Sequence, residues 1–81
     1  MYHSLDITKL ASTKYNGNEI KVILKDSCVG VLWCEDEEEA DWLSWEINDA
    51  ISLGSQSLLN GAMEKIRPKI QWALWVCVIE A

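Results

Sequence analysis

The chain has 81 residues, of which 49 % are apolar and 25 % are charged, the composition of one globular domain spanning residues 1–81. Thirteen acidic side chains against seven basic ones give a net charge of −6. This balance argues against direct binding to nucleic-acid phosphates or to anionic membranes, because both require clustered Lys and Arg. Five Trp in so small a core cannot all be buried with their N–H groups bonded, so at least one is expected at the surface.

The first predicted element is a β-hairpin within TKYNGNEIKVILK. Asn16-Gly17 is a typical pair for a type I′ turn, and a turn centred there makes Lys14 face Glu19 across the strands. The second strand then runs over about 19–25, and alternate apolar side chains share one of its faces.

Two further segments are expected to complete an antiparallel meander. SLDITKLAST, which leads into the hairpin, fits either a strand or a short helix capped by Ser4. After the hairpin, the turn KDSC leads into the strand CVGVLWC, whose side chains alternate between two faces. Val29, Val31 and Trp33 lie on one face, opposite Cys28, Leu32 and Cys34.

Two helices are predicted after these strands. The acidic run CEDEEEADWLSWE begins the first helix, with Asp36 as the N-cap and Glu39 reaching back toward it. The other acids suit the positive end of the helix dipole. We expect a break over 53–57 and a second helix over about 57–66, which Pro68 ends. The apolar stripe of the first helix comprises Ala40, Leu43, Ile47, Ala50 and Ile51.

The last segment, IQWALWVCVIEA, is apolar on both faces and rich in β-branched residues and Trp. This pattern predicts a strand of about ten residues inside the sheet rather than at its edge. The expected fold class is α+β: an antiparallel sheet of about four strands in the order β-β-β-α-α-β, with two helices packed on one face. The second apolar face of the strand also allows a homodimer, the alternative use of the chain as a structural or adaptor protein.

We find no catalytic constellation and expect no enzyme activity, no cofactor and no bound metal. The one histidine, His3, stands near the start, where nothing positions it as a base. Glycine-rich phosphate loops and calcium loops are absent, and consecutive acids on a helix point in different directions. Cys28 and Cys34 lack further soft ligands for zinc. Three cysteines without C-x-x-C spacing, and no signal sequence, indicate reduced thiols in the cytoplasm.

The acidic run also forms a candidate partner-binding surface. With Leu43 at the centre of the buried stripe, Trp45 falls on the opposite side of the helix and Trp42 at the boundary. An exposed Trp ringed by carboxylates is typical of an interface anchor for a basic partner. The alternative is a solvated helix start whose Trp rests on a neighbouring loop. The candidate residues are Glu35, Asp36, Glu37, Glu38, Asp41, Trp42, Trp45 and Asp49.

The segment ADWLSW, residues 40–45, and the chain end VIEA are similar to the small type II-C anti-CRISPR proteins of phages, which cover a nuclease domain of a CRISPR effector. The resemblance implies an inhibitor without catalytic residues. In that family the inhibitory contacts lie on a Ser-Cys pair near the last strand, whereas the corresponding positions here are apolar, around Leu74 and Trp75. No contact residue therefore carries over.

These patterns predict a small acidic inhibitor, encoded by a phage or mobile element, that acts in the host cytoplasm. Its expected partner is a basic protein that handles nucleic acid, such as a CRISPR or other defence nuclease, and the acidic surface would mimic that nucleic acid. A colicin-type immunity protein or an antitoxin has the same small, acidic, non-catalytic profile. These two classes are alternative predictions, and the homo-oligomeric structural or adaptor protein is a third.

Overall fold

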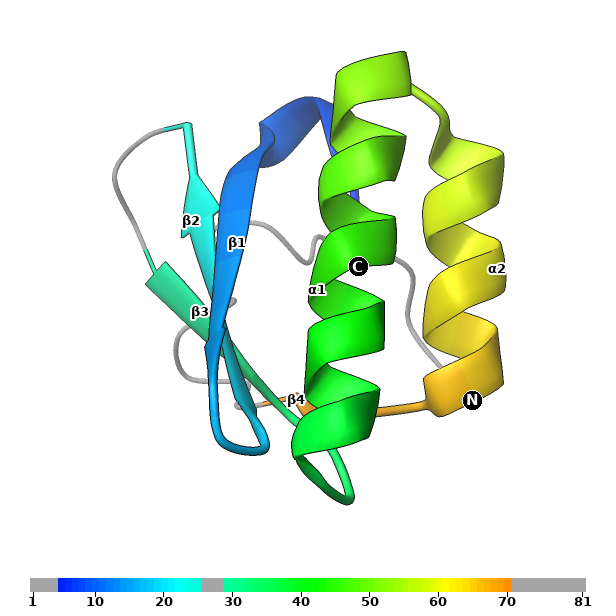
Figure 1. Ribbon diagram of the computed structural model, residues 1–81. Coiled ribbons are helices and arrows are strands. Elements are labelled where there is room, and N and C mark those ends of the chain that lie inside the picture. Colours follow the sequence, from blue (N-terminus) through cyan, green and yellow to red (C-terminus); the bar gives the residue numbers. More distant parts are fainter. Residues whose placement is uncertain (1–4, 26–28, 71–81) are drawn as a thin grey trace.

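The computed structural model describes residues 5–25 and 29–70 and shows an antiparallel sheet covered by two helices (Figure 1). Strands pair antiparallel in the order β1-β2-β3-β4, α1 packs against β1 and β2, and α2 lies beside α1. The predicted α+β class is confirmed. The elements are the 3₁₀ turn η1 (Ile7–Lys9), β1 (Leu10–Asn16), β2 (Glu19–Leu24), β3 (Val29–Trp33), α1 (Glu37–Leu53), α2 (Gln56–Ile66) and β4 (Lys69–Ile70).

The predicted hairpin forms, but its turn lies one residue later than expected. Asn16 pairs with Glu19, so Gly17 and Asn18 occupy the loop. The predicted pairing of Lys14 with Glu19 is therefore wrong, and Lys14 faces another lysine instead. The shift moves each partner by two residues, so the same side chains still face the core.

A tertiary contact explains this position of the turn. Gly17 has a φ of 61°, and Asn16 and Asn18 do not have positive φ. Positive φ at the first central residue alone is the pattern of a type II′ turn, which needs Gly only there. The carbonyl of Asn18 accepts a hydrogen bond from Cys34 N at 2.8 Å, and Asn18 Nδ2 donates to Cys34 O at 3.1 Å. These bonds hold Asn18 in the loop at the end of β3.

The segment before the hairpin is a short 3₁₀ turn followed by a strand. Asp6 caps η1, because its Oδ1 accepts from Thr8 N at 3.0 Å and from Thr8 Oγ1 at 2.7 Å. These hydrogen bonds lower the pKa of Asp6 below its usual value. The strand begins at Leu10, and the register shifts at Ala11, which forms a bulge. The predicted cap Ser4 lies outside the described residues.

The two helices begin and end within about one residue of their predicted positions. Asp36 is the N-cap of α1, and Gly54 ends that helix with a left-handed φ of 63°. Ser55 then caps α2, its side chain accepting from Leu58 N. The second helix ends at a left-handed Arg67, just before Pro68. The break between the helices is thus a C-cap followed directly by a new N-cap.

The core lies between the two helices and the sheet face that they cover. The predicted stripe of α1 is buried, and Ile51 packs against it while partly buried. In β2 and β3 the residues of one parity are buried in the core, as the alternation predicts, and Val29 and Trp33 are exposed. Val31 is an exception, because it is buried although it lies outside the core cluster. The buried cluster comprises Leu5, Ile7, Leu10, Ile20, Val22, Leu24, Leu32, Cys34, Ala40, Leu43, Ile47, Ala50, Leu59, Ala62 and Met63.

The described part of the fourth strand extends the sheet beside β3. Ile70 pairs with Leu32 and Lys69 with Trp33. The remainder of the predicted strand, 71–79, lies outside the described residues, so its length stays a prediction. Its described part stands at the end of the sheet order, beside β3 alone, and not inside the sheet as predicted. His3, Cys28, Cys77, Leu74 and Trp75 also lie outside them.

Candidate functional site

The acidic run forms the start of α1, and part of it has a structural role. Asp36 Oδ1 accepts a hydrogen bond from Glu39 N at 2.9 Å, as the N-cap prediction requires. Glu39 Oε1 accepts from Glu35 N at 3.0 Å, one residue before the group that a capping box would use. The first-turn glutamates also suit the positive end of the helix dipole. Asp36 and Glu39 therefore stabilise the helix start.

The two Trp of α1 lie in different surroundings. Trp45 is 65 % exposed, which confirms that it lies on the outward side of the helix. Trp42 is 36 % exposed, and Nζ of Lys65 in α2 lies 4.7 Å from its ring centroid, within the range of a cation–π contact. Trp42 thus has a cationic partner within the chain. No cation lies over Trp45 in the part of the chain that the structure describes.

Trp45 lines a hollow of about 410 Å³ between α1 and β1, the strand at one end of the sheet order. Asp41 reaches this hollow from the preceding turn of α1, and Tyr15, 41 % exposed, reaches it from β1. We call this feature the Trp45 hollow. Its lining residues are Thr13, Lys14, Tyr15, Asp41, Ser44, Trp45 and Asn48.

Polar side chains of α1 clamp the backbone of β1 within the Trp45 hollow. Asn48 Oδ1 accepts from Thr13 N at 2.8 Å, and Asn48 Nδ2 donates to Thr13 O at 3.2 Å. The buried hydroxyl of Thr13 donates to Ser44 O at 3.0 Å and shares a 2.7 Å bond with Ser44 Oγ. The outward backbone groups of β1 are satisfied at this point, which closes the strand edge there to another chain.

Two carboxylates act on the aromatic part of the Trp45 hollow. The charge of Asp41, burial, the charge of Glu37 and hydrogen bonding to Asp41 together raise the pKa of Tyr15 above its usual value. Within residues 5–25 and 29–70, the acids of α1 make no ion pair, and the pair formed there joins Arg67 to Glu64. Lys14 pairs with Lys21 and also lines the hollow, but among the described residues it makes no ion pair with Asp41.

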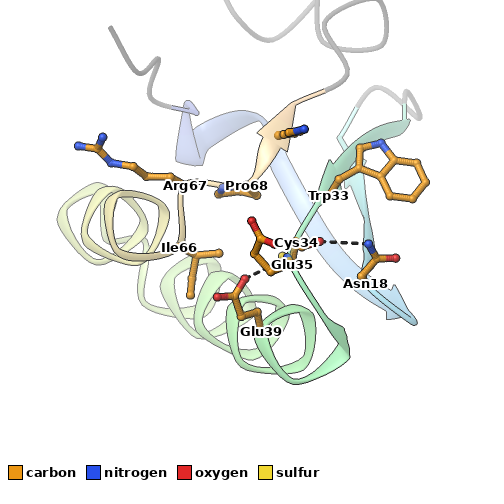
Figure 2. A pocket seen from close by; sticks show the side chains of 9 residues that line it. Asn18, Trp33, Cys34, Glu35, Glu39, Ile66, Arg67 and Pro68 are labelled. Atoms are coloured by element: carbon orange, nitrogen blue, oxygen red, sulfur yellow. Dashed lines mark hydrogen bonds between the residues drawn. The ribbon is translucent and has the colours of Figure 1, made fainter.

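A second hollow, of about 450 Å³, lies at the other end of the acidic run (Figure 2). In Figure 2, Asn18 points toward Cys34, and Glu39 reaches back to Glu35, along the hydrogen bonds given above. We call this feature the Cys34 hollow. It is lined by Asn18, Trp33, Cys34, Glu35, Glu39, Ile66, Arg67, Pro68 and Lys69.

The chemistry of the Cys34 hollow is that of an inert thiol. Cys34 is only 8 % exposed, and burial, followed by the charges of Glu39 and Asp36, raises its pKa to about 11. A thiol with that pKa is protonated at neutral pH, whereas a nucleophile or a metal ligand must be a thiolate. Acidic neighbours oppose ionisation further. The arrangement gives no nucleophile–base pair in the described residues.

The structure separates the eight predicted partner-binding residues into groups. Asp41 and Trp45 meet in the Trp45 hollow, and Glu38 and Asp49 are exposed one turn away on the same stripe of α1. Glu37, in the first turn of α1, does not line the Trp45 hollow, but its charge acts on Tyr15. The other three have different surroundings: Glu35 lines the Cys34 hollow, Asp36 caps α1, and Trp42 contacts Lys65.

Tyr15 is the residue of this surface that sequence reasoning missed. It pairs with Ile20, so it shares the sheet face that the helices cover. An aromatic residue just before the Asn-Gly pair was the available signal. Placing it beside Trp45 requires knowing that α1 crosses β1, a contact between residues far apart in the sequence.

The described residues contain no group of three His, Cys, Asp or Glu side chains arranged to hold a metal ion. Among the described helices, none combines the length and apolar character needed to cross a membrane. Comparison with known proteins finds no matching family model, no matching curated protein and no matching solved structure.

Proposed function

We propose that this protein is a small acidic inhibitor that binds a basic protein through the surface formed by Tyr15, Glu38, Asp41, Trp45 and Asp49, here called the Trp45 surface. The partner is a nucleic-acid-handling protein, such as a CRISPR or other defence nuclease, and bound inhibitor occupies its nucleic-acid groove. The activity requires the inhibitor in the host cytoplasm, and a phage or mobile element is the expected source.

The exposure of Trp45 carries this proposal. A side chain that large and apolar, two-thirds exposed, contributes little to the core, so burial against a partner is the use that gains most free energy. Trp is also enriched among the residues that dominate interface energies. Tyr15 extends the aromatic area across to β1.

The charge of α1 supports a basic partner. The helix has acids along its length and no Lys or Arg. Acids around an apolar anchor steer a basic protein and orient it more than they add affinity. A groove that binds nucleic acid is rich in Lys and Arg, so an unneutralised row of carboxylates complements it.

The direct experiment measures inhibition. Purified protein is added to a type II-C CRISPR nuclease. In a second experiment it is used as bait in host lysate, and any captured basic protein is assayed for nucleic-acid binding. We expect the partner to lose nucleic-acid binding when the wild-type protein is added, and we expect the Trp45→Ala variant not to inhibit this binding. Leu53→Ala is the matched control, because Leu53 has the same 65 % exposure on the same helix and lies outside the Trp45 surface.

Two results would contradict the proposal. In the first, the captured partner binds wild type and Trp45→Ala equally, which shows that another surface is used. In the second, no basic partner is captured and the protein dimerises with rising concentration in sizing experiments, as a homo-oligomeric structural protein would. Inhibition of a toxin instead of a defence nuclease would assign the chain to the immunity proteins or antitoxins.

A further inference from the structure

We propose that the Trp45 hollow is a binding site for a single arginine side chain of the partner, with the guanidinium held between aromatic faces and a carboxylate. The inference rests on the proposed function, whose contact surface it specifies. Three groups from two elements converge there: the indole of Trp45, the phenol of Tyr15 and the carboxylate of Asp41. The first and third come from α1 and the second from β1.

The hollow is a shallow surface depression of about 410 Å³ that is largely open to solvent. A side chain of a partner can therefore lie against it without entering an enclosed cavity. The clamp between Asn48 and Thr13 fixes α1 against β1, so the elements that carry Trp45 and Tyr15 are held together before a ligand arrives. A site that is formed in advance loses less free energy to ordering when it binds.

The charge of the hollow selects a cation. Asp41 and Glu37 lie close enough to the phenol of Tyr15 to disfavour its ionisation, and an anionic ligand would meet the same field. The faces of Trp and Tyr rings attract cations. One such contact, between Lys65 and Trp42, occurs among the described residues. Trp45 is exposed, and no cation of the described residues lies over its ring, although Lys14 lines the same hollow.

The geometry favours guanidinium over ammonium. Guanidinium is planar and weakly hydrated, so it stacks on an aromatic face and also donates two parallel hydrogen bonds to a carboxylate such as Asp41. An ammonium group is strongly hydrated and cannot stack. The hollow offers the aromatic faces and the carboxylate together, which is the combination that distinguishes arginine from lysine.

Three blocked tripeptides test the inference: Gly-Arg-Gly, Gly-Lys-Gly and Gly-citrulline-Gly, the last being the neutral analogue of arginine. Each is titrated into the full chain while proton–nitrogen NMR spectra record the five indole signals, with the Trp45 signal assigned from Trp45→Phe. We expect a saturable shift of the Trp45 indole with the arginine peptide, about tenfold weaker binding of the lysine peptide, and no saturable shift with citrulline.

The variants make the result specific. Asp41→Asn should weaken arginine binding at least about fivefold, since one hydrogen-bonding charge is lost while the shape is kept. Leu53→Ala should leave it unchanged. Equal binding of arginine and citrulline, equal binding of arginine and lysine, or shifts confined to the Trp42 indole would each overturn the inference.

The outcome can be separated from that of the proposed function. If the arginine peptide binds at Trp45 but no nucleic-acid-handling partner is inhibited, the inference stands and the proposed function fails. If a partner is inhibited through Trp45 and the arginine peptide does not bind, the proposed function stands and the inference fails.

Discussion

The Cys34 hollow and the Trp45 hollow are similar in volume, about 450 Å³ and about 410 Å³, but their polar groups differ in bonding. In the Cys34 hollow, the side chains of Asn18 and Glu39 are both hydrogen-bonded to backbone groups of the chain: Asn18 donates to Cys34 O, and Glu39 accepts from Glu35 N. In the Trp45 hollow, the clamp at Thr13 is bonded in the same way, whereas Asp41 has no ion-pair partner among the described residues.

The difference shows that volume alone does not identify a binding surface. A polar group that is already bonded within the chain gains little from a ligand, because it exchanges one hydrogen bond for another. Exposed aromatic area and a carboxylate without an ion-pair partner gain more, since a ligand removes the first from water and neutralises the second. On this basis the slightly smaller hollow is the better candidate.

The largest effect is expected for Trp45→Ala. The substitution should weaken partner binding by about 2 kcal/mol or more, about 30-fold, as truncation of a hot-spot Trp does. The free energy of unfolding should change by no more than about 0.5 kcal/mol, because an outward side chain loses little packing. Binding is measured by calorimetry and stability by urea unfolding. Unfolding of the variant would mean that Trp45 belongs to the core.

The second prediction concerns the clamp. Asn48→Ala removes both hydrogen bonds to the backbone of Thr13 and should lower the free energy of unfolding by about 2 kcal/mol. Ser52→Ala, on the exposed side of α1, controls for the higher helix propensity of Ala. Urea unfolding measures both variants. A change in the free energy of unfolding equal to that caused by Ser52→Ala would show that water replaces the clamp without loss of stability.

Much of the fold follows from local rules, and the exceptions have identifiable physical causes. The helix phase, the cap at Asp36 and the exposure of Trp45 depend on residues within a few turns of one another, so they were predictable. The hairpin register was not, because the bonds between Asn18 and Cys34 decide it, and these residues are 16 positions apart. The predicted turn, Asn16-Gly17, is therefore one residue earlier in the chain than the observed turn, Gly17-Asn18.

The candidate surface was predictable only on its helical side. Asp41 and Trp45 follow from the phase of α1, whereas Tyr15 and the clamp at Thr13 depend on the crossing of α1 over β1. Asn48 and Thr13 are 35 positions apart, and their contact has no signature in the local sequence. Sequence reasoning also could not tell which acids have structural partners, so it grouped Asp36 with Asp41.

The third prediction tests steering by the acids of the Trp45 surface. Replacing Asp41 and Asp49 together by Lys should slow association with a basic partner about tenfold and flatten its salt dependence. Dissociation should change less, since exposed charges contribute mainly to encounter. Stopped-flow measurements at low and high salt check this. An unchanged association rate would mean that the partner does not approach this side of α1.

The fourth prediction separates a structural acid from a surface acid. Asp36→Ala removes the N-cap bond to Glu39 N and should lower the free energy of unfolding by about 1 kcal/mol. Asp49→Ala should change it by less than about 0.5 kcal/mol, because an exposed acid in the second half of a helix gains nothing from the dipole. Equal changes in the free energy of unfolding for the two variants, measured by urea unfolding, would contradict the distinction between Asp36 as a structural acid and Asp49 as a surface acid.

The smallest effect is expected from the pH dependence caused by Cys34. Burial raises the pKa of its thiol from 9.0 to about 11, so the folded state keeps the proton that the unfolded chain loses first. The contribution to stability is therefore complete below pH 9 and decreases as pH rises toward 11, because ionisation increasingly favours the unfolded chain.

Cys34→Ala isolates this contribution from the other groups that titrate in the same range. Urea midpoints for wild type and the variant are compared between about pH 8 and 10, a range that includes the pH at which the unfolded thiol begins to ionise. We expect the wild-type midpoint to fall more steeply than that of Cys34→Ala, with the difference appearing above pH 9. Parallel curves would show that the thiol ionises equally easily in both states, which would reopen the Cys34 hollow as a site for thiolate chemistry.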